Sequence, residues 1–513
     1  MTIPERPRLA PVALLLVAAK LLIHLAAGLA TPYEFHRDEF LYFAMGTHLR
    51  ILHMDFPPLI ALLSEATRVT LGTSFFAYRI VPAVAGTVLL LLTVLIVREL
   101  GGRSLAQALA ALTLILCPLF LRPAVLYQPV VLDQLWWTLG IYALVRLENT
   151  DDPRWWLLLG AAGGLGLLTK FSILFFGFAV LVALSLTPRR RAFLGPWPWI
   201  AMAMALAIGL PSVIGQLTLG WPVVEQMEGL RRAQLDRITF GEYFGFQLLL
   251  GPALALAIAG IVALLVRADL RRHRVVAWIG ITAFVLFAAL KGKPYYLGPV
   301  YPALWAAGAT WIDRLARPRV RRALAGTTVA LVTAYGAFVL PLGLPILAPE
   351  PMARYAKAIG ITAAVQTNWG AILPLPQDYA DMLGWKAKAE AVARVVETLT
   401  PEERARAALY GANYGQAGAL DLYGRALDLP PVISLAGSFT FFGPGDRPGD
   451  PLILLGVEPE ELNTIECDSL ALAARVLNHW GVPGEQDVPV TICRGPSMTP
   501  QELWERAARG RVE

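Results

Sequence analysis

Acidic and basic side chains gather in one short stretch of this otherwise apolar chain, FHRDEFLYFAMG. Asp38 and Glu39 stand side by side there, directly after His36 and Arg37. A further carboxylate, Asp55, follows in the segment HMDFPPL. A positioned carboxylate can take a proton from an acceptor, so these residues are candidates for general-base chemistry. The alternative interpretation of the pair is that both are solvated loop charges.

Isolated lysines in other segments suit the binding of an anion. Lys170 lies in LLTKFS, and Lys291 and Lys293 lie in KGKPYYLGP. Asp133 falls inside an apolar segment, where a carboxylate is costly and usually functional. Lysines of this kind can hold an anionic, lipid-linked substrate while a carboxylate deprotonates the acceptor.

Aromatic and imidazole side chains near these charges permit two interpretations each. Tyr295 and Tyr296 belong either to the same site or to the aromatic belt that membrane proteins place at their interfaces. Three of the six histidines, His36, His48 and His53, share one loop with the carboxylates. No HxH or HExxH spacing is present, so we expect no required cofactor, and a divalent metal stays open as the alternative.

The elements that must position these residues are membrane helices. Of the 513 residues, 56% are hydrophobic and only 16% are charged, against about 25% charged in a soluble domain. Apolar runs of about 20 residues recur as far as Leu347 and then stop. The net charge of +6 sits in short loops, which suits membrane topology and not nucleic-acid binding. We predict a polytopic α-helical membrane module over residues 1–348 and an extracytoplasmic α/β domain over residues 349–513.

The apolar runs predict about eleven transmembrane helices, each about 20 residues long. They cover residues 10–30, 79–98, 104–121, 126–146, 154–169, 171–187, 196–217, 246–266, 275–290, 295–313 and 323–347. Arginines recur in alternate loops and at Arg6 and Arg8, so the positive-inside rule places these loops and the N-terminus in the cytoplasm. The first run is too long for a typical signal peptide, so we expect the first helix to be retained.

The remaining loops are then external, among them residues 31–78, which hold Asp38 and Asp55. Residues 57–72, PPLIALLSEATRVTLG, are the ambiguous segment of this loop. Counted as a span, they would move every later arginine cluster to the outside. We therefore predict an amphipathic helix lying at the outer membrane interface.

The C-terminal region has the pattern of a small α/β domain. Residues 379–398 suit a helix, and ARAALYGANYGQAGALDLYGRALDLPPVISL predicts strand, helix and strand. The segment YGQAG matches a phosphate-binding loop poorly, so we assign no nucleotide site. Cys467 and Cys493 are the only cysteines of this region, and thiols outside the cytoplasm tend to be oxidised. We predict a disulfide between them, whereas Cys117 lies in a span.

A set of motifs in order resembles the GT-C superfamily of polytopic glycosyltransferases, in its bacterial branch related to aminoarabinose transferases and protein O-mannosyltransferases. The motifs are HRDEFLYFA, DFPPL, FAYRIVPAVAG, VVLDQLWWTLGIYALVR, GAAGGLGLLTKFSILFF and KGKPYYLGPVYPALW. The C-terminal segments GANYGQAGALDLYG and LPPVIS resemble the external domain of some bacterial members. The resemblance implies an inverting transfer of a sugar from a polyprenyl-phosphate donor to a lipid, glycan or protein acceptor. It places the reaction at the outer face of the bacterial cytoplasmic (inner) membrane.

The resemblance also implies roles for individual residues. It makes Asp38 the base that activates the acceptor, with Glu39 as its support. The residues implied to bind the donor are Lys170 and Lys293 at its phosphate, and Asp55 and Asp133 around its pocket. Phe56 stands where relatives often have His or Tyr, and Phe171 stands where many have Gly. These departures affect the contacts to the sugar more than the class of reaction.

Two other classes of function compete with this interpretation. A transporter or lipid flippase needs polar residues along a path through the bilayer, often on broken helices in paired repeats. Here the intramembrane charges are few, Lys20 and Asp133, and no internal repeat is visible. An inactive membrane scaffold is the second alternative, and the presence of Asp38, Lys170 and Lys293 argues against it.

Overall fold

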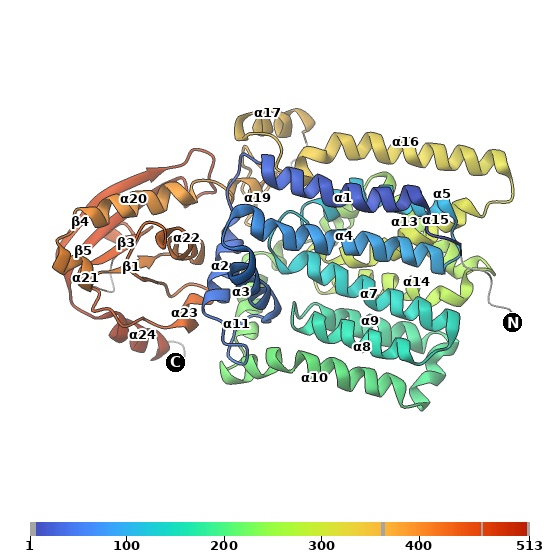
Figure 1. Cartoon of the computed structure of the whole chain (residues 1–513), viewed down its shortest axis with the longest axis horizontal. Coiled ribbons are helices and arrows are strands. Elements are labelled where there is room, and N and C mark those ends of the chain that lie inside the picture. Colours follow the sequence, from blue (N-terminus) through green and yellow to red (C-terminus); the bar gives the residue numbers. More distant parts are fainter. Residues whose placement is uncertain (1–6, 361–364, 463–464, 510–513) are drawn as a thin grey trace. The chain divides into compact units, whose positions relative to one another are not determined.

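The computed structural model describes residues 7–360, 365–462 and 465–509, and Figure 1 shows its helices and strands. The described chain falls into two compact units. The first comprises the described residues of Met1–Ala30, Ile51–Leu59 and Phe76–Leu344. The second comprises those of Thr31–Arg50, Ile60–Phe75 and Pro345–Glu513. The boundary near residue 345 is close to the predicted one, but most of the predicted external loop 31–78 belongs to the second unit.

Helices form the first unit. They are α1 (Pro11–Ala30), α4 (Phe75–Glu99), α5 (Ser104–Leu116), α6 (Pro118–Leu121), α7 (Pro129–Thr150), α8 (Arg154–Leu167), α9 (Ile173–Ser185), α10 (Trp197–Thr218), α11 (Pro222–Ala233), α12 (Phe240–Leu248), α13 (Pro252–Val266), α14 (Arg274–Ala289), α15 (Tyr301–Asp313) and α16 (Pro318–Gly343). Short 3₁₀ helices connect some of them: η1 (Pro188–Leu194), η2 (Leu235–Arg237), η3 (Arg271–His273) and η4 (Pro294–Val300). Every predicted span overlaps at least one of these helices.

The polytopic α-helical membrane architecture is confirmed, but the number of spans is not. Within the described residues, six helices are long and apolar enough to cross a membrane, or up to eight if each bent helix pair counts as one span. Prolines explain part of the difference from about eleven. Pro118 ends α5 early, and Pro299 lies in the 3₁₀ segment η4 before α15. The count of eleven therefore stays a prediction.

The connections that carry arginines meet at one end of the first unit. The contacts that join them are Glu99–Arg146 (2.7 Å), Asn149–His273 (2.8 Å), Asp269–Arg314 (2.9 Å) and Glu148–Arg189 (3.0 Å). These pairs link the turns after α4, α7, α9, α13 and α15. The sequence predicts all five turns on the same side of the membrane, and the structure groups them in that way. Arg6, used in the same argument, lies outside the described residues.

The connections predicted to be external meet at the other end of this unit. The hydrogen bonds that join them are Leu59 N–H to Leu168 O (2.8 Å), Gln216 Nε2–H to Asp55 O (2.6 Å) and Gln247 Nε2–H to Pro294 O (3.1 Å). The helix α7 runs between the two ends, with Asp133 near its start and Asn149 near its finish. The alternation of loops is thus present in the fold, while the side of the membrane that each end faces stays a prediction.

The second unit combines two early helices with the C-terminal region. Its elements are α2 (Arg37–Thr47), α3 (Leu59–Leu71), α17 (Pro349–Ile359), α19 (Gln377–Ala380), α20 (Trp385–Glu397), α21 (Pro401–Arg406), β1 (Ala408–Gly411), α22 (Tyr414–Gly424), β2 (Val432–Ile433), α23 (Phe439–Phe442), β3 (Leu452–Leu455), η5 (Pro459–Glu461), β4 (Cys467–Leu477), β5 (Asp487–Pro496) and α24 (Pro500–Arg509). The helix α3 matches the amphipathic helix predicted at 57–72. Its position at a membrane interface stays a prediction.

A five-stranded mixed sheet organises the C-terminal region, in the strand order β2-β1-β3-β5-β4. The strands β1 and β2 are parallel and are joined through α22, so the predicted strand–helix–strand unit is present. One face of the sheet packs Leu409, Ile453 and Val490 against Val392 and Val396 of α20. The fold class predicted for this region, a small α/β domain, is confirmed.

The other face of the sheet carries the two cysteines. Cys493 on β5 is fully buried beside Leu452 and Leu454 of β3. A disulfide joins it to Cys467, with the two Cα atoms 5.5 Å apart, as the sequence predicts. Cys117 is a free, buried thiol.

A buried ion pair fixes α20 to the loop before β5. The Lys388 side chain is fully buried, and its Nζ lies 2.5 Å from Glu485 Oε2 and 4.0 Å from the centroid of the Trp385 ring. Glu485 also accepts hydrogen bonds from Asn413 Nδ2 at 2.7 Å and from Gln416 Nε2 at 3.3 Å. The Glu485 carboxylate is therefore met by several partners, whereas Glu485 is the charged partner of Lys388.

Removing one member of this pair should destabilise the second unit strongly. Lys388→Met leaves the Glu485 carboxylate buried without its cation, which costs about 3–5 kcal/mol. The double variant Lys388→Met/Glu485→Gln should recover most of that loss, because no unpaired charge remains. Thermal unfolding of the detergent-purified protein measures both. Equal losses in the single and double variants would contradict the assignment.

Candidate functional site

The start of α2 places the acidic pair. His36 is the N-cap residue: its Nδ1 accepts the Asp38 N–H at 3.1 Å, and its own N–H donates to Glu39 Oε2 at 2.6 Å. This reciprocal pair of bonds is a capping box, which satisfies two of the free N–H groups at a helix start. Glu39 is fully buried in this arrangement. Its carboxylate is thus engaged in holding the helix start.

Asp38 has a different environment from its neighbour. Its side chain is 33% exposed, and its Oδ1 accepts a hydrogen bond from the Tyr414 hydroxyl at 2.8 Å. The Arg37 Nε lies 3.9 Å from the same oxygen. Burial and the negative charge of Asp38 raise the pKa of Tyr414 well above its ordinary value, so the hydroxyl keeps the proton that it donates. Of the two carboxylates that are adjacent in the sequence, Asp38 is accessible and Glu39 is not.

A compact set of charges surrounds this carboxylate within the second unit. His36 lies 3.9 Å from Asp38, 3.8 Å from Asp378 and 3.9 Å from Asp381. Arg37 Nη1 lies 3.6 Å from Asp381, and its guanidinium carbon lies 5.5 Å from the centroid of the Tyr414 ring. Two cationic groups thus alternate with three carboxylates around the N-terminus of α2.

The protonation of His36 follows from these neighbours. Burial disfavours the imidazolium, but Asp38, Asp378 and Asp381 outweigh it and raise the pKa of His36 to about 9. The cap bond at Nδ1 favours the neutral ring, yet one neutral cap contributes only about 1 kcal/mol. Three carboxylates around a buried ring are the larger effect. We therefore assign the charged form at neutral pH. In that form Nδ1 carries a proton, so the bond from the Asp38 N–H belongs to the neutral ring, while the bond from the His36 N–H to Glu39 holds the helix start in both forms.

Contacts with distant segments of the chain hold α2 in place. The Glu34 carboxylate accepts the N–H groups of Gly384 (3.1 Å) and Lys386 (2.8 Å) at the start of α20, where a helix favours a negative charge. The helix α22 packs directly against α2. A Cβ on Gly418 would lie 2.7 Å from the Phe40 Cβ, so a glycine is needed at this crossing. The glycines of YGQAG therefore serve helix packing.

A second polar group lies at the end of the first unit where the predicted external connections meet. Asp133 Oδ1 accepts hydrogen bonds from Ser172 Oγ at 2.9 Å and from Trp137 Nε1 at 3.1 Å. Lys170 is close enough for its charge to act on Asp133. The Lys170 Nζ also lies 4.6 Å from the centroid of the Tyr296 ring. The ammonium of Lys170 is thus attracted to the faces of two tyrosine rings.

The structure brings together some of the predicted donor-binding residues and separates others. Tyr295 joins the same group, with its ring centroid 5.9 Å from Lys170 Nζ. Lys293 caps η4, immediately before these tyrosines. Lys291 is exposed and its Nζ lies 3.4 Å from the Asp236 carbonyl oxygen, in a different contact. We name Asp133, Lys170, Ser172, Tyr295 and Tyr296 the lysine–tyrosine cluster.

Asp55 lies on another connection at the same end of the first unit. It is buried, and its Oδ2 accepts a hydrogen bond from Gln226 Nε2 at 3.2 Å. A Cβ on Gly215 would lie 2.5 Å from the Met54 carbonyl oxygen, so the backbone before Asp55 packs tightly on α10. The prolines after it lead to Leu59, which is bonded to the end of α8 two residues before Lys170.

Several residues of these groups were not singled out from the sequence. They are Tyr414, Asp378, Asp381, Ser172 and Gln226. Tyr414 lies in GANYGQAG, a segment with a recognisable pattern. The two aspartates lie in a stretch without any motif, so no sequence signal points to them. Among the described residues, no group of three or more His, Cys, Asp or Glu side chains is arranged to hold a metal ion.

Comparison with known proteins adds a family match and a fold match. Residues 55–214 match the family model described as dolichyl-phosphate-mannose-protein mannosyltransferase. The crystal structure of ArnT from Cupriavidus metallidurans bound to undecaprenyl phosphate is similar to this chain, with a TM-score of 0.62 and 15% identity over 93% of this chain and 97% of that one. The apo structure of the same protein gives a TM-score of 0.62 and 18% identity over the same shares. No curated protein sequence matches the chain.

The fold defines a polytopic α-helical membrane protein with the architecture of the ArnT structures, and residues 55–214 match a mannosyltransferase family model. The family match over residues 55–214 and the shared fold of the solved structures agree with the resemblance that the motifs predict. At identities of 15% and 18%, the solved structures establish the fold, and the chemistry has to be argued from the residues.

The charge on His36 should make the stability of the second unit depend on pH. The folded-state pKa of about 9 is above the ordinary value of about 6.5. The stabilisation is therefore complete below about pH 6.5 and is lost as pH rises through 9. His36→Asn keeps an N-cap acceptor but cannot titrate. Thermal unfolding between pH 6 and 9.5 should show a flatter dependence in the variant, and parallel curves would contradict the assignment.

Proposed function

We propose that this protein is an inverting glycosyltransferase that moves a sugar from a polyprenyl-phosphate donor to an acceptor at the external face of the bacterial cytoplasmic membrane. The observation that carries the proposal is the contrast between two adjacent carboxylates. Asp38 is accessible and held by Tyr414, whereas Glu39 is buried in a cap. A general base must reach its substrate and keep one orientation, and Asp38 meets both conditions.

The proposed step forms one bond and breaks one. The acceptor hydroxyl gives its proton to the Asp38 carboxylate while its oxygen attacks the anomeric carbon of the donor sugar. The bond between that carbon and the phosphate oxygen breaks, and the electron pair leaves with the polyprenyl phosphate. Attack on the face opposite the leaving group inverts the configuration. Where the acceptor is itself an anion, such as a phosphate, proton removal contributes less.

The lysine–tyrosine cluster is the proposed site for the donor phosphate. The Lys170 ammonium stabilises the charge that develops on the leaving phosphate. The ring of Tyr296 lies against the Lys170 ammonium, the charge of Lys170 acts on Asp133, and Lys293 stands directly before the tyrosine pair. The undecaprenyl phosphate bound to the similar ArnT structure supports a donor of this chemical class.

Glu39 and Asp55 have positioning roles in this proposal. Glu39 holds the start of α2, and with it the backbone that carries Asp38. Asp55 holds the connection that ends beside Lys170.

Comparison of glycolipids and glycoproteins between a deletion strain and its parent would identify the acceptor as a lipid, a glycan or a protein.

Replacing the proposed base should abolish most transfer without disturbing the donor. Asp38→Asn should lower the turnover by about 10²–10⁴-fold, the usual contribution of a positioned base. Glu39→Gln is the matched control, since it makes the same change one residue later and its amide oxygen can still accept the cap N–H. The assay is sugar transfer from a synthetic polyprenyl-phosphate sugar to isolated membranes. Turnover near the parental value in Asp38→Asn would reject Asp38 as the base.

Removing the cluster lysine should weaken binding of the lipid phosphate itself. Lys170→Ala should reduce the affinity for undecaprenyl phosphate at least tenfold, because a charge-assisted contact contributes about 1.5–3 kcal/mol. Lys357→Ala, which removes an exposed lysine of α17, is the control. Titration of the purified protein with undecaprenyl phosphate, followed by intrinsic tryptophan fluorescence, measures the affinity. An unchanged dissociation constant in Lys170→Ala would remove this lysine from the site.

A further inference from the structure

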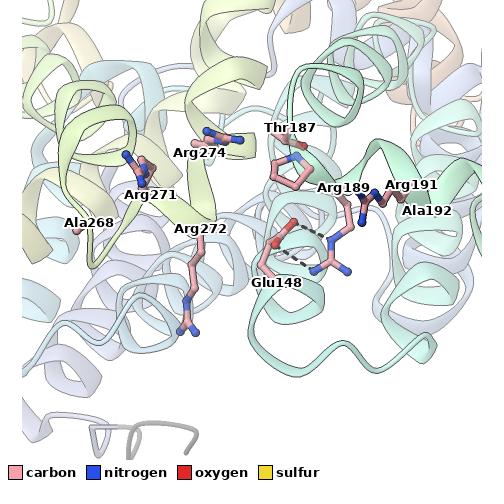
Figure 2. A pocket seen from close by; sticks show the side chains of 10 residues that line it. Glu148, Thr187, Arg189, Arg191, Ala192, Ala268, Arg271, Arg272 and Arg274 are labelled. Carbon is pink, nitrogen blue, oxygen red and sulfur yellow. Dashed lines mark hydrogen bonds and ion pairs between the residues drawn. The ribbon is translucent and has the colours of Figure 1, made fainter. Parts of the chain in front are cut away.

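A basic pocket lies at the end of the first unit where the arginine-bearing connections meet. Its volume is about 640 Å³, within the range of small-molecule sites. Two connections supply its arginines, as Figure 2 shows. One leads from α9 to α10 and gives Arg189 and Arg191, and the other leads from α13 to α14 and gives Arg271, Arg272 and Arg274.

The positive charge of this pocket is largely uncompensated. Glu148 is the acidic residue that lines it, and Arg189 is paired with Glu148 at 3.0 Å and with Asp151 at 2.7 Å. Within the described chain, no ion pair neutralises the other four, Arg191, Arg271, Arg272 and Arg274. Cations around one cavity repel each other unless an anion lies between them. The pocket therefore favours an anionic ligand.

Exposed apolar side chains flank the arginines of this pocket. Leu194, the last residue of η1, is 91% exposed, and Val266, the last residue of α13, is 68% exposed. Leu194 follows the arginines of the α9–α10 connection, and Val266 precedes those of the α13–α14 connection. Exposed apolar groups next to arginines are typical of segments that lie at the membrane surface, with their cations at the level of the lipid phosphates.

We propose that this pocket binds the phosphate group of an anionic membrane lipid. Arginine suits the task because its planar guanidinium forms two parallel hydrogen bonds to a phosphate. The lipid headgroup would join the α9–α10 and α13–α14 connections, which carry the two halves of the positive charge. This site lies at the opposite end of the first unit from the lysine–tyrosine cluster, so it is separate from the proposed donor site. It stands whether or not the proposed sugar transfer does.

The test compares two variants that lose the same charge. Arg191→Gln/Arg271→Gln/Arg272→Gln removes three exposed arginines of the pocket. The control, Arg317→Gln/Arg319→Gln/Arg322→Gln, removes three exposed arginines at the start of α16, outside the pocket. The purified full-length protein in a neutral detergent is titrated with fluorescent phosphatidylglycerol, and the dissociation constant is read from fluorescence anisotropy. Unchanged thermal unfolding confirms that both variants are folded.

The dissociation constant should rise at least tenfold in the pocket variant. In the control it should change less than twofold. Equal losses in both variants would overturn the proposal, since they would reflect general attraction to a positive surface. Unlabelled phosphatidylglycerol should displace the probe, whereas inorganic phosphate at the same concentration should not. If inorganic phosphate displaced the probe at equal concentration, the proposal that the pocket binds a lipid phosphate would be rejected.

Discussion

A charge that leaves water must be met by an opposite charge or by hydrogen-bond donors, and this constraint accounts for where the polar side chains of the protein lie. At one end of the first unit, Glu99 meets Arg146 and so fastens the turns after α4 and α7. In the second unit, Lys388 meets Glu485. Asp38 is enclosed less completely, since its partners leave one third of its side chain open to solvent. The proposed chemistry uses this accessible carboxylate.

The same constraint separates the two carboxylates of the motif HRDEFLYFA. Glu39 meets the backbone N–H of His36, a structural task that any helix start presents. Asp38 meets a hydroxyl whose proton stays in place because the pKa of Tyr414 is raised. The hydroxyl thus orients the carboxylate. Asp38 therefore combines a fixed orientation with partial exposure to solvent.

The sequence predicted the helices of the membrane module well and their breaks poorly. Apolar runs locate a buried or membrane-embedded helix through composition alone, whereas the end of α5 depends on one residue, Pro118. Asp38 was found because charges are rare in this chain. Its partner Tyr414 was not, because the two are 376 positions apart and no local pattern links them. The capping role of Glu39 was also missed, since His36 occupies the cap in place of the usual Ser or Thr.

The second unit is assembled from segments far apart in the chain, and this has a consequence for its biogenesis. Residues 31–50 leave the ribosome about 300 residues before the segment that begins at Pro345. At 5–20 residues per second, that interval is about 15–60 s. During this time α2 lacks Asp381, Tyr414 and its other partners from the C-terminal region. The contacts at the start of α2 can therefore form only after that region has been made, and a chain truncated before Pro345 would lack them.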